Sequence, residues 1–161
     1  MQIVACEKIP TFDHIINNVY LGDIVSATDK SCLKNINIIV NISNSRYKEE
    51  PNIKYYHFDI DDNRNETISR FFSQFINIIK ESENKNILIH CMNSVSRSVS
   101  LVLYYLMTLG MTLNDSIKYL KSKRNQYTRP NVGFFRQLLI IEKELYGINS
   151  ISISDFINTK V

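Results

Sequence analysis

The chain contains no tryptophan and little glycine, proline or cysteine: four, three and three residues among 161. Such low glycine and proline content excludes collagen-like and low-complexity chains. Three cysteines, with no CxxC pair, argue against a disulfide framework and against a zinc site. With 44% apolar residues, the chain is predicted to fold around one core and to keep its cysteines reduced.

Long apolar runs are also missing. No stretch approaches the roughly 20 apolar residues that a membrane helix needs. Residues 1–8 lack the basic and apolar regions of a secretory signal, and Gln2 stands where N-myristoylation requires glycine. We therefore expect no association with membranes.

The positive charge is mild, at +3, and dispersed along the chain. Its densest region, residues 118–136, either attracts anionic substrates or is simply a solvated helix face. Aromatic residues are not interleaved with it as they are in single-strand binding surfaces. The composition therefore argues against nucleic acid as the partner.

The most informative segment runs from Ile87 to Ser98, with the sequence ILIHCMNSVSRS. Its apolar start predicts a buried strand, and the residues after Arg97 predict an amphipathic helix. Cys91 and Arg97 then lie at the two ends of a short loop before a helix, where backbone N–H groups have no intrahelical partner. The loop is predicted to bind an anion and to contain its own nucleophile.

Each side chain in this segment has a predicted role. A helix N-terminus and a nearby cation favour the thiolate form of cysteine, so Cys91 is expected to be a nucleophile at neutral pH. The planar fork of Arg97 can hold two phosphoryl oxygens. Ser98 is placed to donate to the Cys91 sulfur, and His90 to fix the loop without carrying protons.

This segment resembles the His-Cys-x5-Arg-Ser signature of the cysteine-dependent protein tyrosine phosphatases. Residues 18–23 (NVYLGD) and Arg129–Leu138 (RPNVGFFRQL) are similar to the small, atypical dual-specificity branch of that superfamily. The resemblance implies a phosphocysteine intermediate, with no cofactor and no metal. It also implies a supporting role for Asn131, beside that of His90. By their positions in the sequence, Arg64 and Arg129 are candidates for substrate contact.

The resemblance further implies that backbone N–H groups of the loop bind the phosphate. They belong to Met92, Asn93, Ser94, Val95, Ser96 and Arg97. One position departs from the family pattern, because Ser94 stands where family members usually have glycine. Glycine adopts a tight left-handed turn without steric cost, so Ser94 is expected to strain the loop or to shift one donor.

Expulsion of an alcohol or phenol oxygen is easier when a carboxylic acid donates a proton to it. Three candidates, Asp59, Asp61 and Asp62, lie between a strand-like run and a helix that begins near Ile68. By the family pattern the acid precedes that first apolar residue by six positions, which selects Asp62. Aspartates in such loops also serve as turn or cap residues, and Asp59 is expected to be structural.

The alternation of strand-like and helix-like segments predicts an α/β fold. The expected strands are 19–21, 36–42, 54–60 and 87–90, and the expected helices are 26–34, 68–80, 99–109, 113–124 and 132–145. We expect a single-domain protein tyrosine phosphatase-like fold, with a mostly parallel twisted sheet flanked by helices. The phosphate loop is expected between the last central strand and a helix. Residues 1–14 are assigned to an N-terminal extension, 15–147 to the catalytic domain and 148–161 to a tail that adds an edge strand, packs a partner or frays.

The resulting hypothesis is a dual-specificity protein phosphatase acting on phosphorylated proteins at tyrosine and at serine or threonine. Two alternatives remain: an RNA 5′-phosphatase that uses the same loop, and a phosphopeptide-binding module with weak catalysis. A catalytic thiolate is readily oxidised, which predicts a reducing location: the cytoplasm, or the host cytoplasm or a virion if the gene is viral. Both a monomer and a homodimer are compatible with the sequence.

Overall fold

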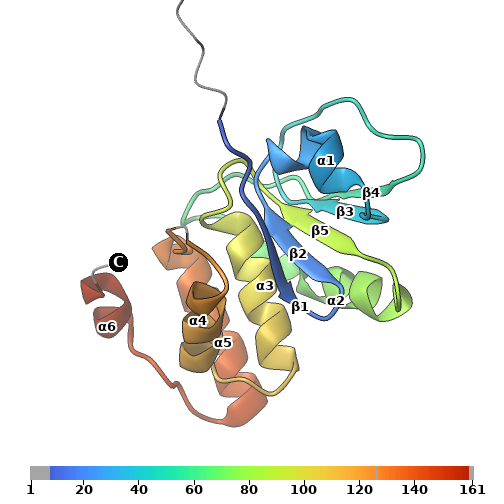
Figure 1. The fold of residues 1–161 in the computed structure, drawn as a ribbon. Helices are drawn as coiled ribbons and strands as arrows, with labels where there is room; N and C mark the ends of the chain where they lie inside the picture. Colours follow the sequence, from blue (N-terminus) through green and yellow to red (C-terminus); the bar gives the residue numbers. More distant parts are fainter. Residues whose placement is uncertain (1–7, 126, 160–161) are drawn as a thin grey trace, which may run out of the picture.

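The computed structural model describes residues 8–125 and 127–159, which form a five-stranded sheet flanked by helices (Figure 1). The strands are β1 (Phe12–Ile16), β2 (Val19–Gly22), β3 (Ile38–Asn41), β4 (Lys54–His57) and β5 (Ile87–His90), in the spatial order β1-β2-β5-β3-β4. All neighbouring strands are parallel except β1 and β2. The predicted fold class is confirmed.

Strand β5 lies at the centre of the sheet, between β2 and β3. Its residues Ile87, Leu88 and Ile89 are all fully buried. A continuous apolar run is typical of a parallel strand that is covered on both faces. The strand therefore carries the segment after it to the carboxyl edge of the sheet, where sites in such folds usually lie.

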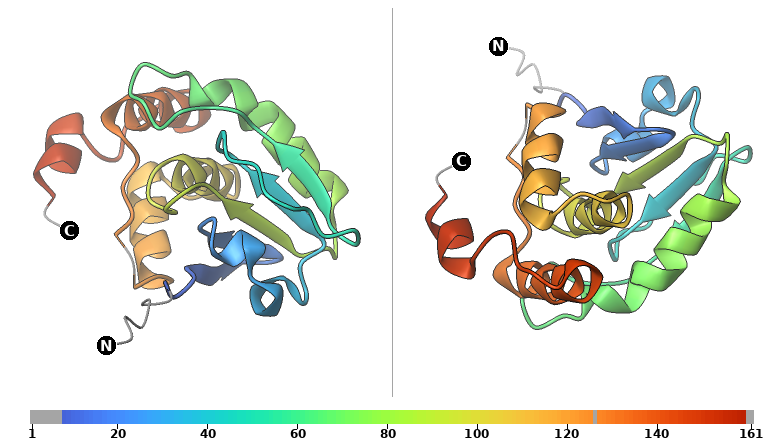
Figure 2. Two further views of the ribbon diagram at one scale, coloured as in Figure 1. Left: turned by 90° about the horizontal axis from the view of Figure 1, so that it is seen from above. Right: turned by 90° about the horizontal axis from the view of Figure 1, so that it is seen from below.

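Helices cover the two faces unequally (Figure 2). They are the 3-10 helices η1 (Ser26–Thr28) and η2 (Ile68–Phe71) and the α-helices α1 (Lys30–Leu33), α2 (Phe72–Glu81), α3 (Arg97–Thr108), α4 (Leu113–Ser122), α5 (Val132–Tyr146) and α6 (Ile153–Asn158). Ile87 and Ile89 belong to the large core shared with α2, α3 and α5, whereas Leu88 packs with Ala27 and Leu33 of η1 and α1. The alternation of strand side chains thus fills two cores.

The helical stretch predicted for residues 26–34 is divided at Asp29. This residue is extended, with φ −94° and ψ 115°, and its carboxylate accepts hydrogen bonds from the backbone N–H groups of Ser31 and Cys32. An aspartate in this position ends one helix and caps the next. Capping therefore replaces the single predicted helix with η1 and α1.

The two ends of the chain contain elements that were not predicted. Strand β1 begins at Phe12, so residues 12–14, assigned above to an extension, belong to the sheet. Residues 1–7 of that assignment lie outside the described part of the chain. In the C-terminal segment, Ser152 caps helix α6 and the ring of Phe156 stacks on Phe135 of α5, with centroids 3.7 Å apart. Within the described part of the tail, residues 153–158 thus form a helix that packs on α5.

Candidate active site

The loop between β5 and α3 carries the predicted nucleophile. Cys91 follows β5 directly and is 3% exposed, at the floor of the loop. Its sulfur lies 3.1 Å from Oγ of Ser98, the second residue of α3. Both described cysteines, Cys91 and Cys32, are free thiols. The structure thus brings the predicted nucleophile and the predicted hydrogen-bond donor into contact.

Three carbonyl groups of this loop accept hydrogen bonds from donors outside it. Met92 O accepts from the N–H of Ile24 at 3.2 Å, Ser94 O from Arg124 at 2.9 Å, and Val95 O from the N–H of Arg129 at 2.9 Å. In a trans peptide the N–H points opposite to the carbonyl that precedes it, and no described peptide bond is cis. The N–H groups of Asn93, Val95 and Ser96 therefore point inward, as an anion-binding loop requires.

Arg97 begins helix α3 and is half-buried. Its Nη1 donates to the carbonyl oxygen of Ile60 at 3.0 Å, which joins the phosphate loop to the loop after β4. Its Nε is buried and has no hydrogen-bond partner in the described part of the chain. A buried donor without a partner is costly, and a phosphoryl oxygen would satisfy it.

Asp62 lies in the loop after β4, with an exposed side chain. Its Oδ1 accepts a hydrogen bond from Nδ2 of Asn131 at 2.8 Å. The backbone N–H of Asn131 donates to Ser96 Oγ at 2.9 Å, while its own Oδ1 caps α5 by accepting from the N–H of Phe134 at 2.9 Å. Asn131 thus connects the predicted acid, the phosphate loop and the start of α5.

Gly133, in the first turn of α5, allows the acid loop to approach this helix. A Cβ placed at Gly133 would lie 1.9 Å from the carbonyl oxygen of Arg64. Any other residue would therefore displace the acid loop or the helix. The small residue is explained by this close approach, since the loop that carries Asp62 rests on the backbone of α5.

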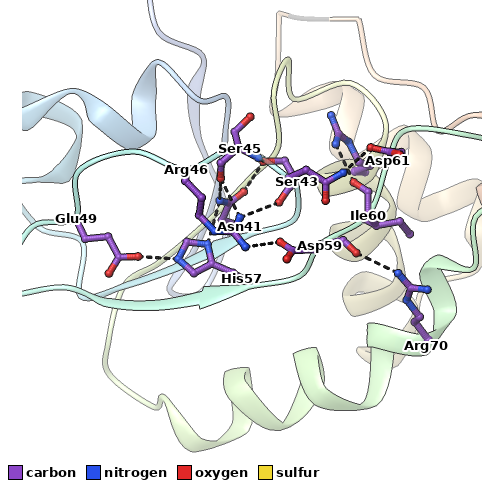
Figure 3. Close-up of polar contacts among 12 residues, drawn as sticks. Asn41, Ser43, Ser45, Arg46, Glu49, His57, Asp59, Ile60, Asp61 and Arg70 are labelled. Carbon is purple, nitrogen blue, oxygen red and sulfur yellow. Dashed lines mark hydrogen bonds and ion pairs between the residues drawn. The ribbon is translucent and has the colours of Figure 1, made fainter.

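The other two candidate aspartates are engaged elsewhere (Figure 3). The Asp61 carboxylate accepts a hydrogen bond from Nδ2 of Asn44, and Asp59 forms an ion pair with Arg46. These contacts join the acid loop to the segment that follows β3. Asp62 is the aspartate that Asn131 links to the phosphate loop.

His90 is fully buried at the end of β5. Its Nε2 lies 2.7 Å from the hydroxyl of Tyr47, and its Nδ1 lies 3.1 Å from the carbonyl oxygen of Cys91. Burial lowers the pKa of His90 from 6.5 to about 4. The ring is therefore neutral at pH 7, with the Nδ1 proton directed to Cys91 O and the Tyr47 hydroxyl donating to Nε2.

Sequence reasoning missed Tyr47, because a single aromatic residue in a loop has no periodic signal. It included Arg124 only in the basic region of residues 118–136 and missed its contact with the loop through Ser94. Arg129, a candidate for substrate contact, has partners within the chain. Its guanidinium packs on the ring of Phe156 and donates to the carbonyl oxygens of Phe156 and Ile157.

Comparison with known proteins matches residues 19–144 to the model of the dual specificity phosphatase catalytic domain. The chain belongs to this family. It is 33% identical to dual specificity protein phosphatase 1 of Arabidopsis thaliana over 137 residues, which cover 81% of this chain and 69% of that protein. The predicted enzyme class, a cysteine-dependent phosphatase with dual specificity, is confirmed at the level of the family.

Two further comparisons bear on length and fold. The chain is 33% identical to the Drosophila melanogaster dual specificity protein phosphatase Mpk3 over 135 residues, 79% of this chain but only 33% of that protein. A crystal structure of a single-residue variant of human DUSP28 superposes with a TM-score of 0.80 at 23% identity, covering 86% of this chain and 99% of that one. This chain thus spans about a third of the length of Mpk3 and nearly all of the DUSP28 variant chain.

Proposed function

We propose that the protein hydrolyses phosphate monoesters of phosphorylated proteins, at tyrosine and at serine or threonine, through a phosphocysteine on Cys91. The observation that carries the proposal is the buried Nε of Arg97, which has no partner in the described part of the chain, beside a loop in which three carbonyl groups accept from donors outside it. An anion with several acceptor oxygens would satisfy these donors, and a phosphoryl group has this property.

In the first step, the Cys91 sulfur attacks phosphorus, so that an S–P bond forms while the ester P–O bond breaks. The inward N–H groups and the Arg97 guanidinium bind the equatorial oxygens as charge develops on them. Asp62 gives its proton to the leaving oxygen. Because Oδ1 of Asp62 accepts from Asn131, the proton is carried on Oδ2.

In the second step, water forms a bond to phosphorus and the S–P bond breaks. The ionised Asp62 takes a proton from that water. The Ser98 hydroxyl, 3.1 Å from the sulfur, donates to the departing thiolate. The enzyme returns to its starting form, with inorganic phosphate as the product and without the need for a metal or cofactor.

A reducing compartment follows from the chemistry of the nucleophile. A thiolate at an anion site oxidises readily to a sulfenic acid, so we propose a cytoplasmic location. Within residues 8–125 and 127–159, no helix has the length and apolar character needed to cross a membrane.

The experiment compares three substrates at equal concentration: a phosphotyrosine peptide, a phosphothreonine peptide and RNA with a 5′-triphosphate. We expect turnover of both peptides and little release from RNA. Preference for the RNA would overturn the protein-phosphatase proposal in favour of an RNA 5′-phosphatase. Tight peptide binding without phosphate release would instead identify a binding module.

Variants test the assigned roles. Cys91→Ser is expected to abolish turnover while retaining peptide binding. Asp62→Asn is expected to slow hydrolysis of the phosphotyrosine peptide by about 10²–10⁴-fold. Hydrolysis of an aryl phosphate with a good leaving group is expected to be slowed much less. Asp61→Asn is the matched control, because it removes the neighbouring carboxylate. If Asp61→Asn gives the larger loss of activity on the phosphotyrosine peptide relative to the aryl phosphate, the assignment of Asp62 as the acid is wrong.

A further inference from the structure

Ser94 has a backbone conformation that serine rarely adopts. Its φ is 58°, in the left-handed region, and the residue is fully buried in the phosphate loop. A Cβ in this region is close to the neighbouring carbonyl oxygen, which is why glycine is usual there. The left-handed conformation is unfavourable for the serine that adopts it, so contacts with other residues must stabilise this turn.

The side chain of Arg124 makes those contacts. Its Nη1 donates to Ser94 O at 2.9 Å and its Nη2 donates to Ser94 Oγ at 2.7 Å, so that both ends of the guanidinium hold one residue. Arg124 lies just after α4, 30 positions along the chain. Its side chain is 0% exposed and therefore does not reach a substrate.

Asp13 of β1 orients the guanidinium from the opposite side. Its Oδ2 accepts from Nε of Arg124 at 2.9 Å, and the two side chains form an ion pair. Nη1 also lies 3.3 Å from Oγ1 of Thr128. The fork is thus anchored by β1 and by the segment before α5, while its two terminal nitrogens face Ser94.

The contact determines the orientation of one peptide group in the anion site. With Ser94 O held by Arg124, the N–H of Val95 in the same trans peptide points inward. Rotation of this peptide would remove a donor from the cradle and place a carbonyl oxygen there. An oxygen facing the substrate would repel a phosphoryl group.

We propose that Arg124 is a positioning residue of the phosphate loop. Oriented by Asp13, it holds the left-handed turn that glycine would adopt by itself, and the Ser94 hydroxyl provides its second attachment point. The proposal rests on the phosphatase function proposed above. It assigns catalytic importance to a buried arginine and its half-buried aspartate partner, both outside the signature segment.

The test is a double-mutant cycle on residues 94 and 124, measured as kcat/KM for an aryl phosphate and as the inhibition constant of inorganic phosphate. We expect Arg124→Met to lower kcat/KM by roughly 10–100-fold and to weaken phosphate inhibition in parallel. In the Ser94→Gly background, the same Arg124 change is expected to cost at least about fivefold less. Equal losses in both backgrounds would overturn the proposal.

Two further variants separate charge from geometry. Lys123→Met is the matched control, because it removes an adjacent exposed cation that lies over the ring of Tyr119; we expect kinetics within about twofold of the native chain. Arg124→Lys keeps the charge but not the fork, and is expected to recover little activity. Full recovery by lysine would contradict the fork model.

A comparison at Ser94 alone covers the case in which Arg124 variants do not fold. Ser94→Ala and Ser94→Gly both remove the hydroxyl, but only alanine keeps a Cβ in the left-handed turn. Alanine is therefore expected to be the less active by about tenfold, and equal activity would contradict the proposal. If the native chain itself turns over no substrate, the proposed function fails; an active native chain without coupling between residues 94 and 124 refutes only this inference.

Discussion

The side-chain amide of Asn131 donates to Oδ1 of Asp62 at 2.8 Å, although 69 positions separate the two residues in the chain. The backbone N–H of Asn131 is bonded at the same time to Ser96 Oγ in the phosphate loop. One residue therefore fixes the proposed acid relative to the site that binds phosphate. Asp62 is exposed and depends on this contact for its orientation.

Replacement of Asn131 by serine tests this contact. Serine caps helices about as well as asparagine but lacks the amide donor. We expect Asn131→Ser to lower kcat/KM for a phosphotyrosine peptide by about tenfold and to affect p-nitrophenyl phosphate much less, because its leaving group needs no proton. Steady-state kinetics on both substrates provide the check, and equal losses would mean that Asn131 does not act through the acid.

Gly133→Ala is expected to displace the acid loop. The added Cβ would lie 1.9 Å from the carbonyl oxygen of Arg64, so backbone must move even though alanine favours a helix by up to about 1 kcal/mol. Activity on the phosphotyrosine peptide should fall while the native fold, measured by circular dichroism, is kept. Unchanged kinetics on this substrate would show that the close approach is not needed for proton donation.

Acid is expected to destabilise the protein through His90. Its pKa is about 4 in the folded chain against 6.5 in the unfolded chain, because burial opposes the charge. Between these values the unfolded chain binds a proton that the folded chain does not. The contribution of neutral His90 to the free energy of unfolding is therefore complete above pH 6.5. It is lost as the pH falls toward 4, by up to roughly 3 kcal/mol.

Two measurements follow for His90. Urea unfolding at a series of pH values should show the free energy of unfolding decreasing below pH 6.5. The NMR signals of the His90 ring, assigned with Tyr47→Phe, should stay those of a neutral imidazole at pH 5.5. Titration of this ring with a midpoint near 6.5 would refute the account of a neutral His90 with a hydrogen bond at each ring nitrogen.

Arg97→Lys separates charge from geometry at the anion site. Lysine keeps the positive charge but has no Nε–H fork, so one phosphoryl oxygen loses its donor. We expect kcat/KM to fall by roughly 10²–10³-fold, with weaker inhibition by inorganic phosphate. Retention of phosphate affinity in this variant would show that the buried Nε of Arg97 is not a ligand of the anion.

Much of the fold was predictable because each central element carries its own signal. The run Ile87–Ile89 is apolar at every position, as a doubly covered strand requires, and the spacing of apolar residues in α2 and α5 is helical. The prediction was less accurate where a capping side chain determines the start of a helix. The alternation of serine and isoleucine in residues 150–153 was compatible with an edge strand. Instead, Ser152 Oγ accepts a hydrogen bond from the N–H of Asp155 and caps the start of α6.

The site was predictable where its residues are close in sequence. Cys91, Arg97 and Ser98 lie in one segment, and Asp62 was selected by the family pattern, in which the acid precedes the following helix by a fixed number of residues. Tyr47 and Arg124 could not be found in this way, because only the folding of the chain brings Tyr47 next to His90 and Arg124 next to Ser94. Their partners lie 43 and 30 positions away, and neither lies in a recognisable motif.

The central claim is that Cys91 carries the phosphoryl group during turnover, and the variant Ser98→Ala tests it most directly. Without the hydroxyl 3.1 Å from the sulfur, departure of the thiolate is expected to become the slow step, so that the intermediate accumulates. Acid quench of this variant during turnover of p-nitrophenyl phosphate, followed by mass spectrometry, should find one phosphoryl group on the peptide containing Cys91. Continued turnover with no phosphorylated Cys91 at any quench time would contradict the account.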